Sequence, residues 1–256
     1  MGSSLPVDRR RLAVSLGFSG ACDNSLDAVG GRDWVSELLF AWCQIAVDVS
    51  RLAEDLIVYS SREFSLIRIA DAYSTGSSLM PQKRNPDGAE LARATGGVLL
   101  GTLAGYIATL KGLPTGYSKD LQEDKRALFG AEQRLAATLA VLTGTIATLE
   151  IGPGAGPGDP AALATEVADH LVRTGLPFRQ AHDLAGALVR RAEDLGLAVS
   201  DLTPQQRADV DPRLEDLPVE LWDAEAALER RQSLGGSSRA RVREQLEAAR
   251  GRADRD

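Results

Sequence analysis

Residues 76–86 read Gly-Ser-Ser-Leu-Met-Pro-Gln-Lys-Arg-Asn-Pro and place two hydroxyls, an ammonium and a carboxamide in one short segment. A glycine and two prolines interrupt regular structure, so we expect a loop. In it Lys83 can neutralise an anion, Asn85 can donate an amide hydrogen bond, and Ser77 or Ser78 can exchange a proton. These residue types favour proton abstraction beside a carboxylate. The alternative is an exposed turn with a chance mixture of polar residues.

The composition is that of a globular, helical protein. Of the 256 residues 44% are hydrophobic, 25% are charged and 5% are aromatic, which favours an all-α fold. The net charge of −7 disfavours a basic surface for nucleic acid. The two cysteines lack metal-binding spacing and suit a reducing compartment, and no apolar secretory segment follows the first charged residues. We therefore expect a cytoplasmic protein.

Apolar residues recur three and four positions apart from Trp34 to Ser60, which predicts one long helix with an apolar face. That face is formed by a stripe of Val35, Leu38, Trp42, Ile45, Val49, Leu52 and Leu56, widened by the neighbouring Leu39, Ala46 and Ala53. Another long helix is predicted at 121–150, where a leucine recurs at every seventh position. Apolar faces of this length need more partners than one chain supplies, so we expect a homo-oligomer.

The second long helix is predicted to begin at Pro86 and Asp87 and to end before Gly112. Its glycines recur every fourth residue, at positions 97, 101 and 105, and leave a smooth face where another helix can approach closely. The uncharged stretch 94–110 is short for a membrane span, so we interpret it as a buried core helix with no membrane partner.

Three domain-level segments are predicted. Residues 1–151 form a central helical-bundle domain that contains the signature loop 74–86. Residues 152–160 contain four glycines and three prolines and are interpreted as a linker. Residues 161–256 form a small helical C-terminal domain, whose helices are expected at about 161–174, 178–195, 203–210 and 237–253.

The segment 76–86 also resembles the signature GSSxMPxKxNP of the fumarase/aspartase superfamily. Four further stretches resemble the argininosuccinate lyase family within it. Residues 110–125 match KGLPxxYxxDxQEDK, residues 24–33 match NSLDAVxxRD, and 175–182 with 229–236 look like the family's C-terminal part. The resemblance extends over essentially the whole chain and implies long central helices from a superfamily bundle.

The resemblance implies catalytic roles at four positions. Ser77 matches the serine that removes a proton from the carbon beside a carboxylate. Lys83 and Asn85 match the residues that bind this carboxylate and stabilise the dianionic intermediate. Glu90 matches the acid that orients a catalytic histidine, and the alternative is an acid that only interacts with the helix dipole.

Substrate binding is assigned to Arg32, Ser78, Tyr117, Gln122 and Lys125. Tyr117, Gln122 and Lys125 match family contacts to the substrate, and Arg32 matches an arginine near the active site. Two of these positions have a structural alternative. Lys125 can form a salt bridge with Glu123 or Asp124, and Arg32 can pair with Asp27 or Asp33.

The implied reaction is the reversible elimination of argininosuccinate to L-arginine and fumarate in arginine biosynthesis. No metal or organic cofactor is implied, because the ionised carboxylate of the substrate serves as the electron sink. The family forms a homotetramer in which each active site combines regions from three subunits.

The family's HxAR-type and TxxQxAQP-type regions, which lie in its N-terminal half, do not occur in this sequence. Two interpretations follow. The chain is either a truncated or split argininosuccinate lyase completed by an N-terminal partner polypeptide, or a catalytically inactive helical assembly module derived from the superfamily. A lyase for a related succinyl adduct is a further alternative. We expect negligible lyase activity from the chain alone.

Overall fold

The computed structural model describes residues 2–76, 78–80, 83–154 and 160–255. The chain divides into two compact units, Met1–Ala155 and Gly156–Asp256. Helices account for most of both units and the few strands are two residues long, so the fold is all-α as the sequence predicts. The predicted linker lies near the division, and its residues 155–159 are outside the described part of the chain.

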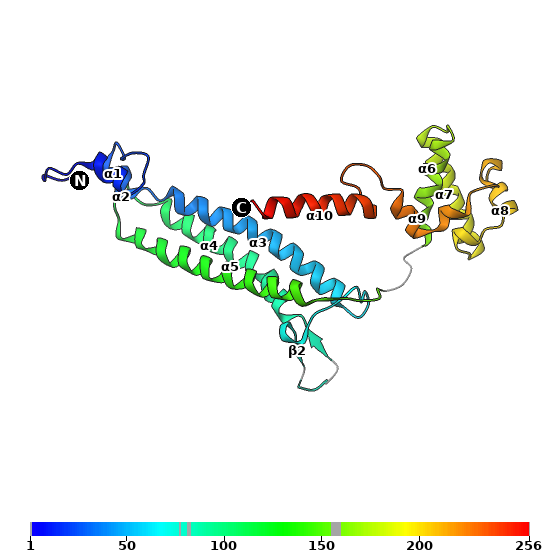
Figure 1. Ribbon diagram of the computed structural model, residues 1–256, viewed down its shortest axis with the longest axis horizontal. Helices are drawn as coiled ribbons and strands as arrows, with labels where there is room; N and C mark the ends of the chain where they lie inside the picture. The colour runs from blue at the N-terminus through cyan, green and yellow to red at the C-terminus, as the bar shows by residue number, and fades with distance from the viewer. Residues whose placement is uncertain (1, 77, 81–82, 155–159, 256) are drawn as a thin grey trace. The chain divides into compact units, whose positions relative to one another are not determined.

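Unit 1 is built on three long helices that lie side by side (Figure 1): α3 Asp33–Ser60, α4 Asp87–Leu110 and α5 Glu123–Thr148. This confirms the three predicted long helices. Two short helices, α1 Arg9–Ser15 and α2 Ser25–Gly30, precede them, and the 3₁₀ turn η2 Lys119–Gln122 leads into α5. The Asn24 side chain caps α2 by accepting hydrogen bonds from the backbone N–H groups of Leu26 and Asp27, which satisfies otherwise unpaired donors.

The buried face of α3 agrees with the predicted apolar face except at Cys43, Ile45 and Leu52. Ile45 and Leu52, which were expected in the stripe, are exposed. The residues that α3 buries include several small ones, and they are Val35, Leu39, Cys43, Ala46, Val49, Ala53 and Leu56. Small side chains let α3 and α4 approach closely, and the bulky residues of α3 then fall outside this contact.

The close helix contact predicted at the glycine face of α4 is not made by the described part of this single chain. No described atom outside the local backbone lies within 4 Å of the position a Cβ would take at Gly97, Gly101 or Gly105. The close helix contact is made instead by Gly96, where a Cβ would lie 3.3 Å from the carbonyl oxygen of Ala46. The three-glycine face of α4 is therefore exposed in the single chain.

Helix α4 is the one described helix that is long and apolar enough to cross a membrane by length and composition, with a mean hydropathy of 1.2 over its most apolar window. Leu99, Leu103 and Tyr106 pack into the core with α3 and α5. Only 33% of that window is buried. The helix is thus a core helix on one face and an exposed apolar surface on the others.

Short strands, which the sequence analysis did not anticipate, organise the end of unit 1 where α4 begins. Strand β1 Ile67–Arg68 pairs antiparallel with β4 Glu150–Ile151, and β2 Thr75–Gly76 pairs antiparallel with β3 Arg84–Asn85. The 3₁₀ turn η1 Asp71–Tyr73 lies between β1 and β2. The first pair ties the end of α5 to the chain before the signature loop, and the second pair turns that loop into a hairpin, which we call the signature hairpin.

Gly144 of α5 provides the surface on which Tyr73 rests. A Cβ there would lie 1.9 Å from the Tyr73 hydroxyl oxygen and 2.4 Å from its Cζ, so Gly144→Ala should displace the ring and η1. We expect a loss of about 1–3 kcal/mol of stability, the usual cost of overpacking. Gly130→Ala on the same helix meets no described atom within 4 Å and should be neutral or stabilising by about 0.5–1 kcal/mol.

Thermal unfolding and amide hydrogen exchange of residues 71–86 would measure both variants. Equal effects of the two substitutions would contradict the assigned contact.

Unit 2 is a set of short helices around its own core. The longer ones are α6 Ala164–Arg173 and α7 Phe178–Leu195, and the core gathers Val167, Leu171, Ala181, Leu188, Leu202, Leu214 and Leu221 among others. The shorter elements are η3 Pro160–Leu163, η4 Val199–Asp201, α8 Pro204–Ala208, η5 Pro212–Leu214, η6 Val219–Trp222 and α9 Ala224–Glu229. The last helix, α10 Arg239–Ala253, confirms the helix predicted at 237–253 and buries none of its residues.

Candidate functional site

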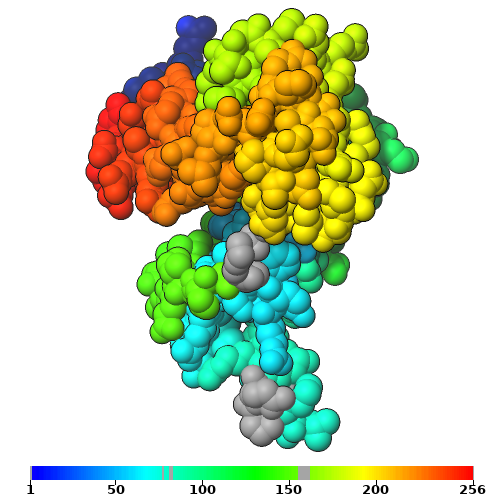
Figure 2. Space-filling view, turned by 90° about the vertical axis from the view of Figure 1, so that its right-hand side faces the viewer, coloured from blue at the N-terminus to red at the C-terminus, as the bar shows by residue number. Residues whose placement is uncertain are grey.

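The signature hairpin carries the first group of predicted site residues. Asn85 lies in β3 opposite Thr75 and is half-buried, whereas Ser78 and Lys83 are exposed in the loop. Glu90 is exposed in the first turn of α4. Ser77, the predicted base, lies outside the described residues. Figure 2 shows the described part of the hairpin, in blue-green, standing out from unit 1.

Polar contacts fix both arms of the signature hairpin at its base. The Arg84 guanidinium pairs with Asp71 of η1, and the Thr75 hydroxyl donates to the carboxylate of Asp87. Each of these side chains is at least partly solvent-accessible, so each contact alone contributes little to the stability of the fold. Together they hold the two strands beside the start of α4 and leave the loop that bears Ser78 and Lys83 projecting.

The second group of predicted site residues lies where α3 and α5 begin. The Arg32 Nε donates to Asp124 Oδ2 at 2.7 Å, and the Lys125 Nζ lies 2.7 Å from Asp124 Oδ1. The Tyr117 loop packs against the end of α2, since a Cβ on Gly30 would lie 2.7 Å from the Gly116 carbonyl oxygen. We call this region the Asp124 end of unit 1.

These contacts identify the ion-pair partners of Arg32 and Lys125. Arg32 pairs with neither Asp27 nor Asp33 but with Asp124, which is 92 positions away. Lys125 pairs with Asp124, one of its two expected partners. Gln122, at the end of η2, is exposed, and so is Tyr117.

Asp124 is the residue that the sequence analysis missed as part of this site. Its exposed fraction is 5%. Burial acts to raise the pKa of this carboxyl, but the adjacent Lys125 ammonium and the hydrogen bond from Arg32 outweigh it and hold the pKa below its usual range. The carboxylate is therefore ionised at neutral pH. In the sequence it was considered only as a possible partner of Lys125, and it lies between Gln122 and Lys125, which carry the predicted roles.

The two groups of site residues lie at opposite ends of unit 1 (Figure 1). Helix α4 begins beside the signature hairpin and ends at Leu110, beside the Asp124 end. Its 24 residues span about 36 Å at 1.5 Å per residue. No small molecule can contact both groups in one copy of the chain.

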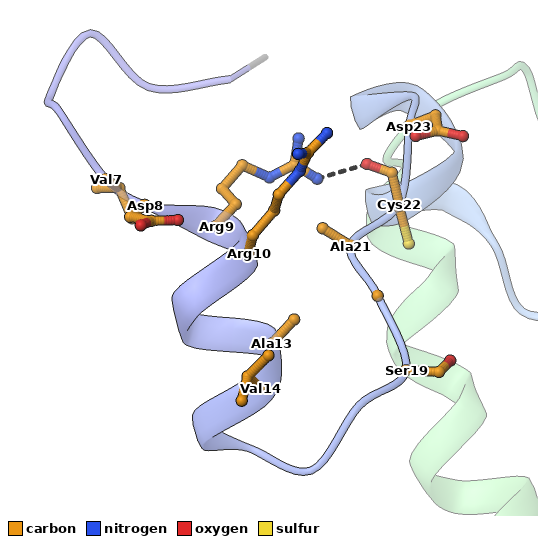
Figure 3. Close-up of a pocket in the computed structure, with 11 residues that line it drawn as sticks. Val7, Asp8, Arg9, Arg10, Ala13, Val14, Ser19, Ala21, Cys22 and Asp23 are labelled. Atoms are coloured by element: carbon orange, nitrogen blue, oxygen red, sulfur yellow. Dashed lines mark hydrogen bonds between the residues drawn. The ribbon is translucent and has the colours of Figure 1, made fainter.

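A separate polar cavity of about 690 Å³ lies between α1 and residues 19–23. The Arg9 guanidinium donates to the Cys22 carbonyl oxygen at 2.5 Å, and the Arg10 side chain extends in the same direction (Figure 3). Except for Ala13, the residues that line this cavity are exposed. None of the predicted site residues lines it.

Comparison with known proteins gives two family matches, "Lyase" over residues 1–101 and "Argininosuccinate lyase C-terminal" over residues 161–229. The argininosuccinate lyase of Thermobifida fusca is 46% identical over 253 residues, which cover 96% of this chain and 52% of that protein. The chain belongs to the argininosuccinate lyase family. The argininosuccinate lyase of Schizosaccharomyces pombe is 44% identical, covering 96% of this chain and 54% of its own length.

The chain thus spans about half the length of the argininosuccinate lyases it matches. Among solved structures, EDDS lyase in complex with formate matches 98% of this chain and 52% of its own, with a TM-score of 0.79 and 25% identity. The helical fold is therefore that of the fumarase/aspartase superfamily, and the signature hairpin lies in the portion shared with the argininosuccinate lyase family.

Proposed function

We propose that the chain supplies two active-site regions of an argininosuccinate lyase, the signature hairpin and the Asp124 end, for arginine biosynthesis in the cytoplasm. The observation that carries the proposal is the identity of 44–46% with argininosuccinate lyases over nearly the whole chain. The presentation of Lys83 and Asn85 at one hairpin is consistent with it.

The proposed reaction breaks a carbon–nitrogen bond without a cofactor. Ser77 removes a proton from the carbon beside a substrate carboxylate, and the resulting dianion is stabilised by the Lys83 ammonium and the Asn85 amide. The electron pair then forms the carbon–carbon double bond of fumarate while the guanidino nitrogen leaves with its bonding pair. A general acid protonates that nitrogen, and we assign this acid to a region outside the present chain.

Self-association is part of the proposal, because the two groups of site residues are too far apart within one copy. Large apolar side chains are exposed on all three long helices, and they include Phe40, Ile45, Leu52, Leu91, Leu100, Ile107, Phe129 and Ile146. A soluble monomer rarely leaves so much apolar surface in water. Copies packed antiparallel along these helices would bring a signature hairpin beside another copy's Asp124 end, and a homotetramer provides such contacts.

The proposal is tested by reconstitution with the catalytic regions that the chain does not contain. The chain is co-expressed and co-purified with the N-terminal half of the Thermobifida fusca relative, and fumarate release from argininosuccinate is followed by ultraviolet absorbance. We expect turnover from the complex and negligible turnover from either polypeptide alone.

Light scattering on the same samples reports the assembly state. A complex that assembles but releases no fumarate would contradict the proposed function and favour the alternative of an inactive assembly module. Turnover of EDDS but not of argininosuccinate would instead indicate a lyase for a related adduct.

A further inference from the structure

Asp124 is a buried charged group that the proposed reaction does not use directly. It lies in the first turn of α5 and holds one cation on each carboxylate oxygen, Arg32 on Oδ2 and Lys125 on Oδ1, both at 2.7 Å. A carboxylate with an exposed fraction of 5% requires such partners, since an unpaired buried charge is strongly destabilising.

The two cations differ in what they offer to a ligand. The Arg32 side chain is 17% exposed, and its Nη1 donates to the backbone carbonyl oxygens of Gly31 and Val29. Its guanidinium is therefore used largely to fix the start of α3. The Lys125 side chain is 56% exposed, so its ammonium faces both the buried carboxylate and solvent.

Lys125 shares its surroundings with the other exposed side chains assigned to substrate binding at this end. Gln122 is three positions earlier, where α5 begins, and three positions correspond to neighbouring places on a helix surface. A flexible lysine side chain loses rotamer entropy when it is ordered. If the Asp124 carboxylate already holds the ammonium in place, less of this entropy is lost when the ligand binds.

We propose that Asp124 is a positioning residue, which Arg32 holds in place and which aims the Lys125 ammonium at an anionic group of the substrate. The inference rests on the proposed function and deepens it. It also revises the role of Arg32 from a substrate contact to a support for Asp124. Asp124 itself touches no substrate and acts through Lys125.

The kinetic test uses the reconstituted complex with Asp124→Asn, Lys125→Ala and the double variant. We expect Asp124→Asn to raise KM for argininosuccinate about tenfold and to change kcat less than about threefold, as for a lost binding interaction. In the Lys125→Ala background Asp124→Asn should have almost no further effect on KM, because residues that act through one another are not additive. A similar KM increase in both backgrounds, or no increase at all, would overturn the proposal.

Two control variants distinguish a positioning role of Asp124 from a non-specific disruption of the local structure. Asp120→Asn removes an exposed acid from the same segment, and Tyr106→Phe removes a nearby buried hydroxyl that has no hydrogen-bond partner in the described part of the chain. Both should leave KM unchanged. A KM increase in either control equal to that of Asp124→Asn would contradict a specific role for Asp124.

A measurement without catalysis keeps this inference separate from the proposed function. In the purified chain labelled with ¹⁵N-arginine, the Arg32 Nε–H should exchange slowly with water, and Asp124→Asn should accelerate that exchange at least about tenfold, as expected when a buried charged hydrogen bond is lost. Tyr106→Phe should not change it. Fast exchange in the wild-type chain would overturn the proposal even if the complex is active, whereas an inactive complex with slow exchange would refute only the proposed function.

Discussion

Replacement of Glu166 by Gln is expected to lower the free energy of unfolding of unit 2 by about 3 kcal/mol. Glu166 is 1% exposed and receives the Arg230 Nε on Oε2 at 2.6 Å and the Arg231 guanidinium on Oε1. Breaking a buried ion pair costs about 3–5 kcal/mol. We expect the lower end of that range because both arginines are partly exposed and can recruit water.

The ion pairs of Glu166 connect α6 to the segment after α9. Arg231 also pairs with Asp169 of α6 at 3.0 Å, and Arg230 donates to the backbone carbonyl oxygen of Glu220. Hydrogen exchange of the peptides that contain α6 and residues 229–238 reports the opening of this region in the full chain. Faster exchange should therefore be concentrated there.

A matched control is provided by the Glu225–Arg239 ion pair, in which both side chains are about 60% exposed. Glu225→Gln should change stability by less than about 1 kcal/mol, as is usual for surface pairs. If Glu166→Gln and Glu225→Gln had the same small effect, the assigned importance of the buried network would be wrong.

Local sequence patterns predicted the elements of the fold well. The lengths of α3, α4 and α5 followed from apolar periodicity and from Pro86 and Gly112 at helix boundaries. The apolar face of α3 was predicted, but which of its residues are most deeply buried was not, because that depends on how closely α4 approaches. Leu39 and Ala46, which were predicted beside the stripe, are buried together with Cys43, whereas Ile45 of the stripe itself is exposed.

The sequence predicted which residue types form the site, but not which of them contact one another. Lys83 and Asn85 could be singled out because they lie in a short loop between two prolines and suit proton abstraction beside a carboxylate. The Arg32–Asp124 pair was not predictable, since nothing local connects residues 92 positions apart. The exposed glycine face of α4 shows the same limit, because a close helix contact specified by sequence need not be made within one chain.

Single substitutions at the two ends of unit 1 are expected to have the largest effects on turnover by the reconstituted complex. Lys83→Ala removes the ammonium that stabilises the dianion, and we expect kcat to fall about 10²–10³-fold, the range for loss of one stabilising donor. Lys125→Ala should raise KM strongly because a substrate contact is lost. Arg62→Ala, an exposed cation in the turn after α3, is the control and should leave both constants unchanged.

The central claim is that each active site combines the signature hairpin of one copy with the Asp124 end of another. Co-expression of the Lys83→Ala and Lys125→Ala chains with the N-terminal polypeptide tests it most directly, because a mixed assembly contains some sites in which both ends are intact. At argininosuccinate concentrations well below KM, where Lys125→Ala also lowers the rate, random mixing of equal amounts should give about one quarter of the wild-type activity, as the statistics of a symmetric oligomer require. Activity no higher than the average of the two single-variant complexes would contradict the claim.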